Sequence, residues 1–254
     1  MILAAGRGTR LAALGLKVPK PLVDVGGQPL LSRQLGYLAG QGVQRVVVNA
    51  HHLASAIESF AAEYKSPPEL RVVVEPELLG TAGGVRNALD EFDGAPIIVL
   101  YGDVLMDAPL APLLALHRGL DAQATLAVYR STDVLGKGTL AVNDEGYVTG
   151  FQEKASTAVQ DGALINAGLY VLEPEVVSSL PAGTPLDFGH DVFPALIAAG
   201  GRLAAHVLQE PVIDVGTPEG LAQARELVEA RACARAPAGG KDLRQRGPEA
   251  RLDP

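Results

Sequence analysis

The sequence predicts an α/β protein with a doubly wound, mostly parallel, Rossmann-like sheet and a smaller β-rich lobe. Two observations support this fold class. Over the first half of the chain, short apolar runs alternate with stretches of helical periodicity, which is the rhythm of βαβ units with right-handed crossovers. Residues 96–101 (PIIVLY) form an apolar run of the kind typical of a strand buried on both faces of a parallel sheet.

The first half contains four candidate strands and three candidate helices. The helix expected over residues 28–39 has Pro29 in its first turn and a leucine on one face at every third or fourth position. The run RVVVNA at residues 45–50 is rich in valine, as strands are. Strands are expected at residues 2–5, 45–50, 70–75 and 96–101, and helices at residues 28–39, 53–64 and 81–91.

The pattern changes after Asp121, where strands follow one another more closely. A turn at residues 143–146 separates two of them, as in a β-hairpin. Strands are expected at residues 124–129, 138–142, 147–151 and 163–172, and helices at residues 191–199 and 218–231. We expect this half to extend the same sheet and to form one wall of a cleft. One domain should span residues 1–232, followed by a disordered tail over residues 233–254, because the chain becomes Ala/Pro/Gly-rich and then polar.

Composition excludes several classes of protein. The chain has 254 residues, 48% of them hydrophobic, and a net charge of −8, so a nucleic-acid partner is not expected. Its single Cys233 cannot form an internal disulfide, which fits a reducing compartment. No apolar run reaches about 18 residues and no export signal begins the sequence, so a cytoplasmic protein without a membrane partner is expected. Since Met1 directly precedes an apolar strand, whether the natural start lies upstream stays open.

The stretch from Leu3 to Leu22 (LAAGRGTRLAALGLKVPKPL) is a glycine-rich loop that follows the first strand. Glycines let backbone N–H groups approach an anion closely. The first 20 residues hold four cations and no acid, namely Arg7, Arg10, Lys17 and Lys20. A triphosphate and a second phosphate sharing one cleft would need such a concentration of positive charge. The stretch fits neither the Walker A pattern nor GxGxxG, because Leu11 stands at the third glycine of the latter; by themselves, Gly6 and Gly8 fit an ordinary tight turn equally well.

Five further segments place polar side chains where a ligand could reach them. The segment Glu75–Gly84 (EPELLGTAGG) leads from a strand into a helix, whose start should present free N–H groups. Asp103 follows a buried strand, and a carboxylate at the carboxyl end of such a strand is well placed to hold Mg²⁺. The other three are FQEK (151–154), INAG (165–168) and IDVGTPE (213–219). Taken singly, each also has a structural explanation, such as a glycine-rich helix start, a loop-capping aspartate or a solvated surface pair.

Taken together, these motifs resemble the signature of the sugar-1-phosphate nucleotidyltransferases, or NDP-sugar pyrophosphorylases. The first motif of that family reads roughly (L)AGGxGTRLxPLTxxxPKPL, and the others follow here in the family's order up to about residue 230. The resemblance implies a Mg²⁺-dependent enzyme that transfers a nucleoside monophosphate from an NTP to a sugar 1-phosphate by a single in-line displacement, giving an NDP-sugar and pyrophosphate. It also implies a nucleotidyltransferase sheet, with residues 1–232 as the catalytic domain and the β-rich lobe binding the sugar.

The resemblance assigns roles to individual residues. Arg10 and Lys20 are expected to stabilise the departing pyrophosphate and Lys154 to steer the sugar phosphate, as the catalytic set. The metal ligands are expected to be Asp103 and Asp214. The nucleotide is expected to contact Leu3, Ala5, Gly6, Gly8, Thr9, Arg10, Lys20, Glu75, Gly80, Thr81, Ala82 and Gly102. The sugar phosphate is expected to contact Gly138, Glu153, Lys154, Asn166 and Gly168.

The chain departs from the family pattern at a few positions. Ala13 and Gly15 replace a proline and a threonine, but neither position is expected to touch phosphate. Lys137 replaces a tyrosine near the sugar, and the tryptophan usual before Asp214 is absent. The segment Asp187–Leu196 (DFGHDVFPAL) resembles the family's [SF]xxDxFPxL, which implies a packing and substrate-side element.

Several alternatives for substrate and function stay open. The GTAG and INAG segments look most like those of mannose-1-phosphate or heptose-1-phosphate guanylyltransferases, which favours GTP and a mannose-1-phosphate-like sugar. Thymidylyl or uridylyl transfer to glucose 1-phosphate or another sugar 1-phosphate is the alternative, although the glutamine-containing base loop typical of thymidylyltransferases is missing. A non-catalytic regulatory protein that binds a nucleotide sugar is an alternative of another class. A glycosyltransferase is a further alternative, but it should carry a DxD motif, whereas here the strand ends in Gly102-Asp103 and the next aspartate is Asp107. A homo-oligomer is compatible with the sequence.

Overall fold

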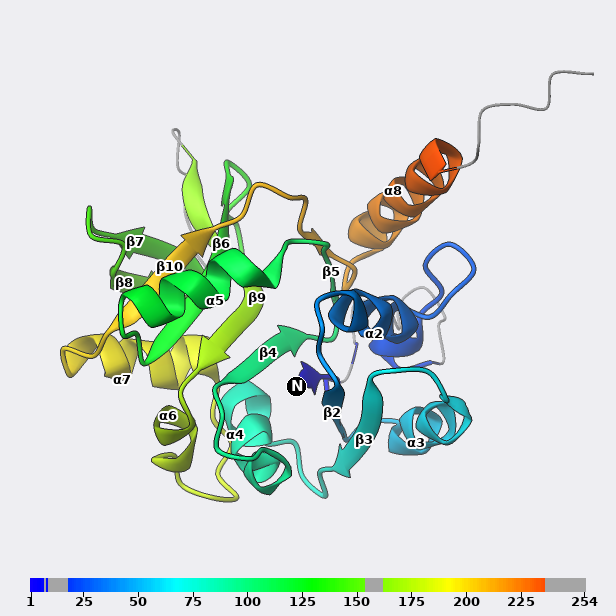
Figure 1. Cartoon of the computed structure of the whole chain (residues 1–254), viewed down its shortest axis with the longest axis horizontal. Coiled ribbons are helices and arrows are strands. Elements are labelled where there is room, and N and C mark those ends of the chain that lie inside the picture. The colour runs from blue at the N-terminus through cyan, green and yellow to red at the C-terminus, as the bar shows by residue number, and fades with distance from the viewer. Residues whose placement is uncertain (7, 9–17, 154–161, 236–254) are drawn as a thin grey trace, which may run out of the picture.

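The computed structural model describes residues 1–6, 8, 18–153 and 162–235 of the chain, and a single large sheet forms its centre (Figure 1). Among the described residues, seven strands follow one another across this sheet in the order β10-β6-β9-β4-β1-β2-β3, and the hairpin of β7 and β8 is added beside β9. A separate small antiparallel pair joins β5 (Val104–Leu105) to β11 (Ile213–Asp214). The predicted α/β class is confirmed.

The first half of the chain builds four parallel strands and the helices that connect them. In spatial order these strands are β4 (Ile97–Tyr101), β1 (Ile2–Leu3), β2 (Arg45–Ala50) and β3 (Glu69–Val74). The connecting helices are α2 (Leu30–Gly40), α3 (Ala54–Glu63) and α4 (Gly80–Asn87), with 3-10 turns at Lys20–Leu22 and Leu89–Glu91. Strands β2 and β3 lie on one side of β1 and β4 lies on the other, so the chain changes direction across the sheet beside β1. Open α/β sheets bind their ligands at such a point.

The second half extends the same sheet through β9 (Ala163–Leu172), which lies antiparallel between β4 and β6. The remaining strands are β6 (Ala124–Ser131), β10 (Leu203–Val207), β7 (Thr139–Val142) and β8 (Val148–Gln152). The remaining helices are α5 (Leu110–Gly119), α6 (Pro174–Ser178), α7 (Phe193–Ala198) and α8 (Pro218–Arg235), and a π-helical turn at Phe188–Val192 leads into α7. The expectation that this half continues the first sheet is confirmed.

Two hydrophobic cores lie on opposite faces of the sheet, because neighbouring residues of a strand point to opposite sides. In β2, Val46 and Val48 belong to the core that α2, α3 and α5 cover, whereas Val47 belongs to the core that α4, α6 and α7 cover. In β9, Tyr170 faces the second core together with Phe188 and Phe193. The chain is therefore wound on both faces, and the α4 face carries the aromatic cluster that supports the site described below.

A bulge in β9 shapes the sheet next to the predicted sugar-binding residues. Leu126 of β6 pairs with Tyr170, but Val128 pairs with Asn166, so three residues of β9 face one residue of β6. Gly168 lies in this bulge with a φ of +71°, which side chains other than glycine rarely adopt. On the C-terminal side of the bulge β9 pairs with β4, and on the N-terminal side it pairs with β7.

Most predicted elements are confirmed, with differences at their ends. The strands predicted at residues 45–50 and 163–172 match β2 and β9. The helix predicted over residues 81–91 is wrong in length, because α4 ends at Asn87 and a 3-10 turn follows. Helices α5 and α6 and strand β10 were not predicted. None of the helices in the described ranges has the length and apolar character to span a bilayer.

Candidate active site

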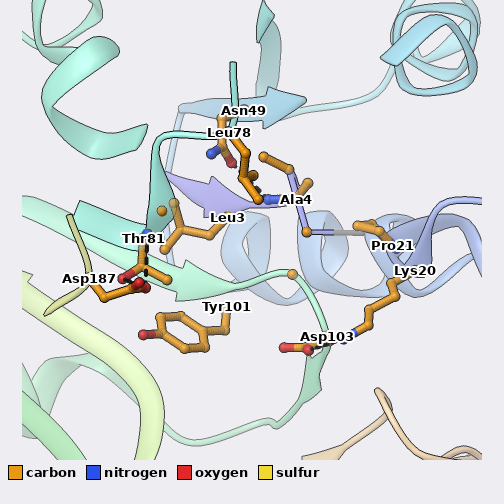
Figure 2. A pocket seen from close by; sticks show the side chains of 14 residues that line it. Leu3, Ala4, Lys20, Pro21, Asn49, Leu78, Thr81, Tyr101, Asp103 and Asp187 are labelled. Atoms are coloured by element: carbon orange, nitrogen blue, oxygen red, sulfur yellow. Dashed lines mark hydrogen bonds and ion pairs between the residues drawn. The ribbon is translucent and has the colours of Figure 1, made fainter. Parts of the chain in front are cut away.

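A pocket of about 300 Å³ lies at the carboxyl ends of β1 and β4, where the winding direction of the sheet changes (Figure 2). It is lined by Leu3, Ala4, Ala5, Gly6, Lys20, Pro21, Asn49, Leu78, Gly80, Thr81, Tyr101, Gly102, Asp103 and Asp187. In Figure 2, Lys20 and Asp103 approach each other at one end of the pocket, while Thr81 and Asp187 lie at the other. The ring of Tyr101 lies between the two ends.

Two glycines form parts of the pocket where a side chain has no room. A Cβ on Gly102 would lie 2.5 Å from the carbonyl oxygen of Leu3, which already accepts the Gly102 N–H at 2.9 Å. A Cβ on Gly80 would lie 2.6 Å from the carbonyl oxygen of Leu186, and Gly80 has a φ of +72°. Both residues were predicted to contact the nucleotide. The close backbone packing explains why glycine stands at each position.

Two predicted metal ligands and one predicted catalytic cation converge. The ammonium of Lys20 donates to Asp103 Oδ2 at 2.9 Å, and their side chains are only 16% and 25% exposed. Asp214 comes from β11, which pairs with β5 directly after Asp103, and Val215 N–H donates to the carbonyl of Asp103 at 2.7 Å. A Cβ built on Gly216 would lie 2.7 Å from Asp214 Oδ1, 3.0 Å from Lys20 Nζ and 3.1 Å from Asp103 Oδ2. Both carboxylates and the ammonium therefore surround one point.

This donor set fits a hard divalent cation that is shared with a ligand. Mg²⁺ takes oxygen donors and is commonly held by one or two carboxylates together with substrate phosphates. Asp103 and Asp214 provide two such carboxylates. Within the described ranges, no group of three or more His, Cys, Asp or Glu side chains could form a protein-only metal cage. The arrangement thus suits a metal that arrives with a phosphate better than a structural metal ion.

The four predicted sugar-binding residues that the structure describes also lie together. A Cβ on Gly138 would lie 3.0 Å from Glu153 Oε2 and 3.4 Å from Asn166 Cβ. The backbone N–H of Asn166 donates to the carbonyl of Gly138 at 2.9 Å. A Cβ on Gly168 would lie 2.9 Å from Cγ of Tyr101, so this cluster adjoins the pocket through the Tyr101 ring.

Two tyrosines, the fully buried Tyr170 and the partly buried Tyr101, connect this cluster to the base of the pocket. Asn166 Nδ2 donates to Tyr170 Oη at 2.7 Å, and Asn166 Oδ1 accepts the Gly168 N–H at 3.0 Å. The ring of Tyr170 packs edge-on against that of Tyr101, with the ring centroids 5.6 Å apart. Burial raises the pKa of both phenols above the ordinary range for tyrosine, so both stay protonated at neutral pH.

Three N–H groups in the first turn of α4 are already bonded within the protein, which differs from the expectation of free N–H groups there. The N–H groups of Ala82 and Gly83 donate to the carbonyl of Leu186 at 2.8 and 3.1 Å. The N–H of Thr81 donates to Asp187 Oδ1 at 3.3 Å. Segment 184–188 thus returns from the second half of the chain and occupies the N–H groups of Thr81, Ala82 and Gly83, so these three are not free for an anion.

Glu75 has a buried position beneath the pocket instead of a place in its lining. Its side chain is 2% exposed, with Oε1 accepting from Asn49 Nδ2 at 2.6 Å and Oε2 accepting from the Leu79 N–H at 3.1 Å. Asn49 Oδ1 in turn accepts the Ala4 N–H at 2.8 Å. The Glu75–Asn49 pair therefore ties the ends of β1, β2 and β3 to the start of α4. A direct contact of Glu75 or of the buried Ala82 with a nucleotide stays a prediction.

The structure gathers most of the predicted site residues that it describes. Those lining the pocket are Leu3, Ala5, Gly6, Lys20, Gly80, Thr81, Gly102 and Asp103. Gly8 lies against the Lys20 side chain, since a Cβ there would be 3.0 Å from Lys20 Cγ. The predicted residues Thr9, Arg10 and Lys154 fall outside the described residues. The lining residues absent from the predicted set are Ala4, Pro21, Asn49, Leu78, Tyr101 and Asp187. Of these, Asn49 offers a sequence signal, a polar side chain in the valine-rich run RVVVNA, and Asp187 begins the segment that the resemblance marks as a substrate-side element.

The family assignment agrees with this geometry. The model of the nucleotidyl transferase family matches residues 1–231, and the chain belongs to that family. It is 34% identical over 221 residues to the mannose-1-phosphate guanylyltransferase of Mycobacterium tuberculosis, covering 86% of this chain and 61% of that protein. It is 32% identical over 230 residues to a UTP–glucose-1-phosphate uridylyltransferase of Synechocystis, covering 85% and 59%. The chain therefore spans about three fifths of the length of these curated relatives.

Solved structures resemble this one over nearly their full length. The crystal structure of HddC from Yersinia pseudotuberculosis has a TM-score of 0.78 and 29% sequence identity, covering 89% of this chain and 97% of HddC. A crystal structure of HddC complexed with GMP-PN has a TM-score of 0.77 over the same coverage.

Proposed function

We propose that this chain transfers a nucleoside monophosphate from an NTP to a sugar 1-phosphate, releasing pyrophosphate and an NDP-sugar. The observation that carries the proposal is the convergence of Asp103, Asp214 and Lys20 at one end of the pocket. Gly6, Gly80 and Gly102 leave backbone exposed in the pocket wall, and the cluster around Asn166 adjoins the pocket through Tyr101. Membership of the nucleotidyl transferase family and the names of the two relatives support the same reaction class.

The reaction needs no covalent enzyme intermediate. An oxygen of the sugar phosphate, already anionic at neutral pH, forms the new bond to the α-phosphorus. The bond from that phosphorus to the bridging oxygen breaks, and pyrophosphate leaves with the electron pair. Because nucleophile and leaving group are both anions, the protein has to position them and neutralise their charge.

The residues of the site divide this work. Asp103 and Asp214 would hold Mg²⁺, which supplies charge neutralisation on the phosphate oxygens when it is bound. Lys20, now paired with Asp103, adds positive charge beside the phosphates. Arg10 and Lys154 are proposed to stabilise the pyrophosphate and to steer the sugar phosphate, on the strength of the sequence resemblance.

We further propose GTP and a mannose-1-phosphate-like sugar as the substrate pair. The support is the sequence resemblance, the relative named a mannose-1-phosphate guanylyltransferase and the structural similarity to HddC, which has been crystallised with GMP-PN. The uridylyltransferase relative has a similar level of identity, so uridylyl transfer to glucose 1-phosphate is the second candidate.

An activity matrix tests these proposals. The chain is incubated with GTP, ATP, UTP or dTTP and with mannose, glucose or heptose 1-phosphate, with Mg²⁺ or with EDTA, and pyrophosphate and NDP-sugar are quantified. We expect pyrophosphate release that needs both substrates and Mg²⁺, with the highest kcat/KM for GTP and a mannose-1-phosphate-like sugar. Nucleotide binding without any turnover would contradict the enzyme proposal and favour the regulatory alternative.

A further inference from the structure

The carboxylate of Glu153 packs against two buried glycines that are about 50 residues apart in the chain, Gly138 and Gly189. A Cβ on Gly138 would lie 3.0 Å from Glu153 Oε2. A Cβ on Gly189 would overlap the same oxygen and would lie 3.1 Å from Glu153 Cδ. Neither glycine has a positive φ, so backbone conformation does not require glycine at either position. The space that a side chain would need is the space that the Glu153 carboxylate occupies.

Gly189 lies in the π-helical turn before α7, and aromatic packing fixes this turn relative to β8. The fully buried ring of Phe188 stacks on Phe193, with the ring centroids 5.4 Å apart. Phe151, two residues before Glu153, packs against the same Phe193 ring at a centroid distance of 5.7 Å. One ring therefore holds both the turn and the end of β8 that leads to Glu153. Turns of this kind are rare and frequently lie at functional sites.

The two residues directly before Gly189 are bonded to the pocket. Asp187 lines the pocket, and its Oδ1 accepts from Thr81 Oγ1 at 2.9 Å. The N–H of Phe188 donates to Thr81 Oγ1, also at 2.9 Å. Neither of these bonds involves Gly189. This short segment therefore borders both the pocket, through Asp187, and the cluster around Asn166, through Gly189.

We propose that Gly189 is a positioning residue for the sugar 1-phosphate. Because it has no side chain, the Glu153 carboxylate can lie beside Gly138, where it accepts hydrogen bonds from the sugar hydroxyls. A carboxylate only accepts, so its position decides which hydroxyls it reaches. Glu153 is an exposed residue, so a ligand can reach it although its Oε2 lies against buried glycines. This inference rests on the proposed function, because it takes the cluster around Asn166 as the sugar site.

Addition of a single methyl group tests the proposal. In Gly189→Ala the Glu153 carboxylate must move away from the new Cβ. We expect KM for the sugar 1-phosphate of the most active substrate pair to rise about tenfold, the loss of roughly one hydrogen bond to a charged acceptor. KM for the NTP should stay within twofold, because the bonds of Asp187 and Phe188 to Thr81 do not involve residue 189. An unchanged KM for the sugar phosphate, or equal rises for both substrates, would overturn the proposal.

A matched control and a double-mutant cycle separate positioning from a general disturbance of this region. Gly150 lies in β8, three residues before Glu153, but a Cβ there would meet only Ala141 Cβ, at an ordinary contact distance of 3.6 Å. Gly150→Ala should therefore leave both KM values unchanged. In a Glu153→Ala background, which lacks the carboxylate, Gly189→Ala should have no further effect on KM for the sugar phosphate. An effect that persists in this background would contradict the proposal.

Glu153→Asp tests the position of the carboxylate while keeping its charge, and it remains available if Gly189→Ala does not fold. The shorter side chain withdraws the carboxylate by one methylene group from both glycines. KM for the sugar phosphate should therefore rise about as much as in Gly189→Ala, again with little change in KM for the NTP. A near-normal KM for the sugar phosphate in Glu153→Asp would show that the position of this carboxylate does not matter, and the inference would be wrong.

Thermal unfolding without substrate distinguishes this inference from the proposed function. If the Glu153 carboxylate lies against residue 189, Gly189→Ala should lower Tm by roughly 2–10 °C more when Glu153 is present than in the Glu153→Ala background. Equal shifts in the two backgrounds would sink the inference even in an active enzyme. If the unmodified protein is inactive with every substrate pair, the proposed function fails, and calorimetric titration with mannose or glucose 1-phosphate replaces KM. No binding, or a Kd that Gly189→Ala leaves unchanged, would then overturn the inference as well.

Discussion

At the scale of single residues, the most informative feature is the meeting of Lys20, Asp103 and Asp214. Two carboxylates that approach one point repel each other, and in this structure the Lys20 ammonium lies beside them and offsets part of that repulsion. The same point suits a divalent cation that arrives with the nucleotide. When the nucleotide is bound, the Lys20 ammonium would contact the phosphates and lose part of its contact with Asp103.

Neutralising either carboxylate should abolish most of the activity. We expect Asp103→Asn and Asp214→Asn each to lower kcat by about 10²–10³-fold, because each removes a charge that stabilises the transition state. Initial rates of pyrophosphate release over a range of Mg²⁺ concentrations measure this. Asp107→Asn is the control, since Asp107 pairs with Arg231 outside the pocket and should leave the rate near that of the unmodified protein. Near-normal rates in both pocket variants would refute the assignment.

Gly80 combines a left-handed backbone with a close approach of the Leu186 carbonyl. The contribution of each feature to the stability cost of replacing this glycine can be separated. Gly94 also has a positive φ, +77°, but a Cβ there meets nothing within 4 Å. Gly94→Ala should therefore lower the free energy of unfolding only by the penalty for a left-handed backbone, about 1–2 kcal/mol. Gly80→Ala should cost about 1–3 kcal/mol more, because the backbone around residue 186 must shift. Urea unfolding of the two variants gives the difference, and equal costs would show that residue 186 moves freely.

At the scale of elements, α4 owes its position to partners from distant parts of the chain. Glu75 and Asn49 hold the loop before it, and segment 184–188 satisfies its first turn. The glycines of GTAGG allow these approaches, since a Cβ on Gly83 would lie 2.5 Å from the carbonyl of Thr184. In this structure the glycine-rich helix start thus serves close packing.

Truncating Glu75 should destabilise the protein and loosen the pocket. Glu75→Ala leaves Asn49 Nδ2 and the Leu79 N–H without their buried acceptors, so we expect a loss of about 2–4 kcal/mol in the free energy of unfolding. KM for the NTP should rise as well, because Asn49 and Ala4 line the pocket. Glu69→Ala is the control, since Glu69 pairs with Arg71 on the surface and its removal should leave stability unchanged. If Glu75→Ala were as stable as the unmodified protein, the buried Glu75–Asn49 pair would not hold the start of α4 as described.

The sequence predicts long periodic elements well and misses those that depend on partners. The run RVVVNA identifies β2 correctly because β-branched residues dominate it. Strand β10 (LAAHV) has no such run and becomes a strand by pairing with β6. Helix α4 stops at Asn87 and not at residue 91, and nothing local marks that end. Local preference decides where an element is strong, and tertiary contacts decide the remainder.

At the scale of the whole molecule, the site is a product of the complete sheet. Short motifs, each local in the sequence, identify Gly6, Gly102 and Asp103, which the structure places in one pocket. Asp187 lines the same pocket only because segment 184–188 returns to α4 from about 100 residues away in the chain, as its hydrogen bonds to Thr81 attest. Leu78 and Pro21 contribute apolar surface, for which single residues carry no signal. The resemblance of DFGHDVFPAL to a family motif points to a substrate-side segment, but only the long-range assembly shows that Asp187 itself lines the pocket.

Substrate binding should stabilise the folded molecule as a unit. At a free concentration of 100 times its Kd, a ligand adds about 2.7 kcal/mol, or roughly 5–10 °C in Tm for a domain of this size. We expect GTP with Mg²⁺ to give a shift of this order, and GTP with EDTA a clearly smaller one. Differential scanning calorimetry measures both, with Asp103→Asn as the variant that should lose the Mg²⁺-dependent part. Equal shifts with and without the metal would contradict the role assigned to the carboxylate pair.

The position of β9 has a consequence for how the protein is made. This strand lies between β4 and β6, yet it is synthesised after both. On the ribosome, the growing chain must keep the apolar edge of β4 unpaired for the several seconds until residues 163–172 emerge. During that interval the edge is open to other unfinished chains, so the time before β9 arrives is when chaperone binding would protect the nascent protein most.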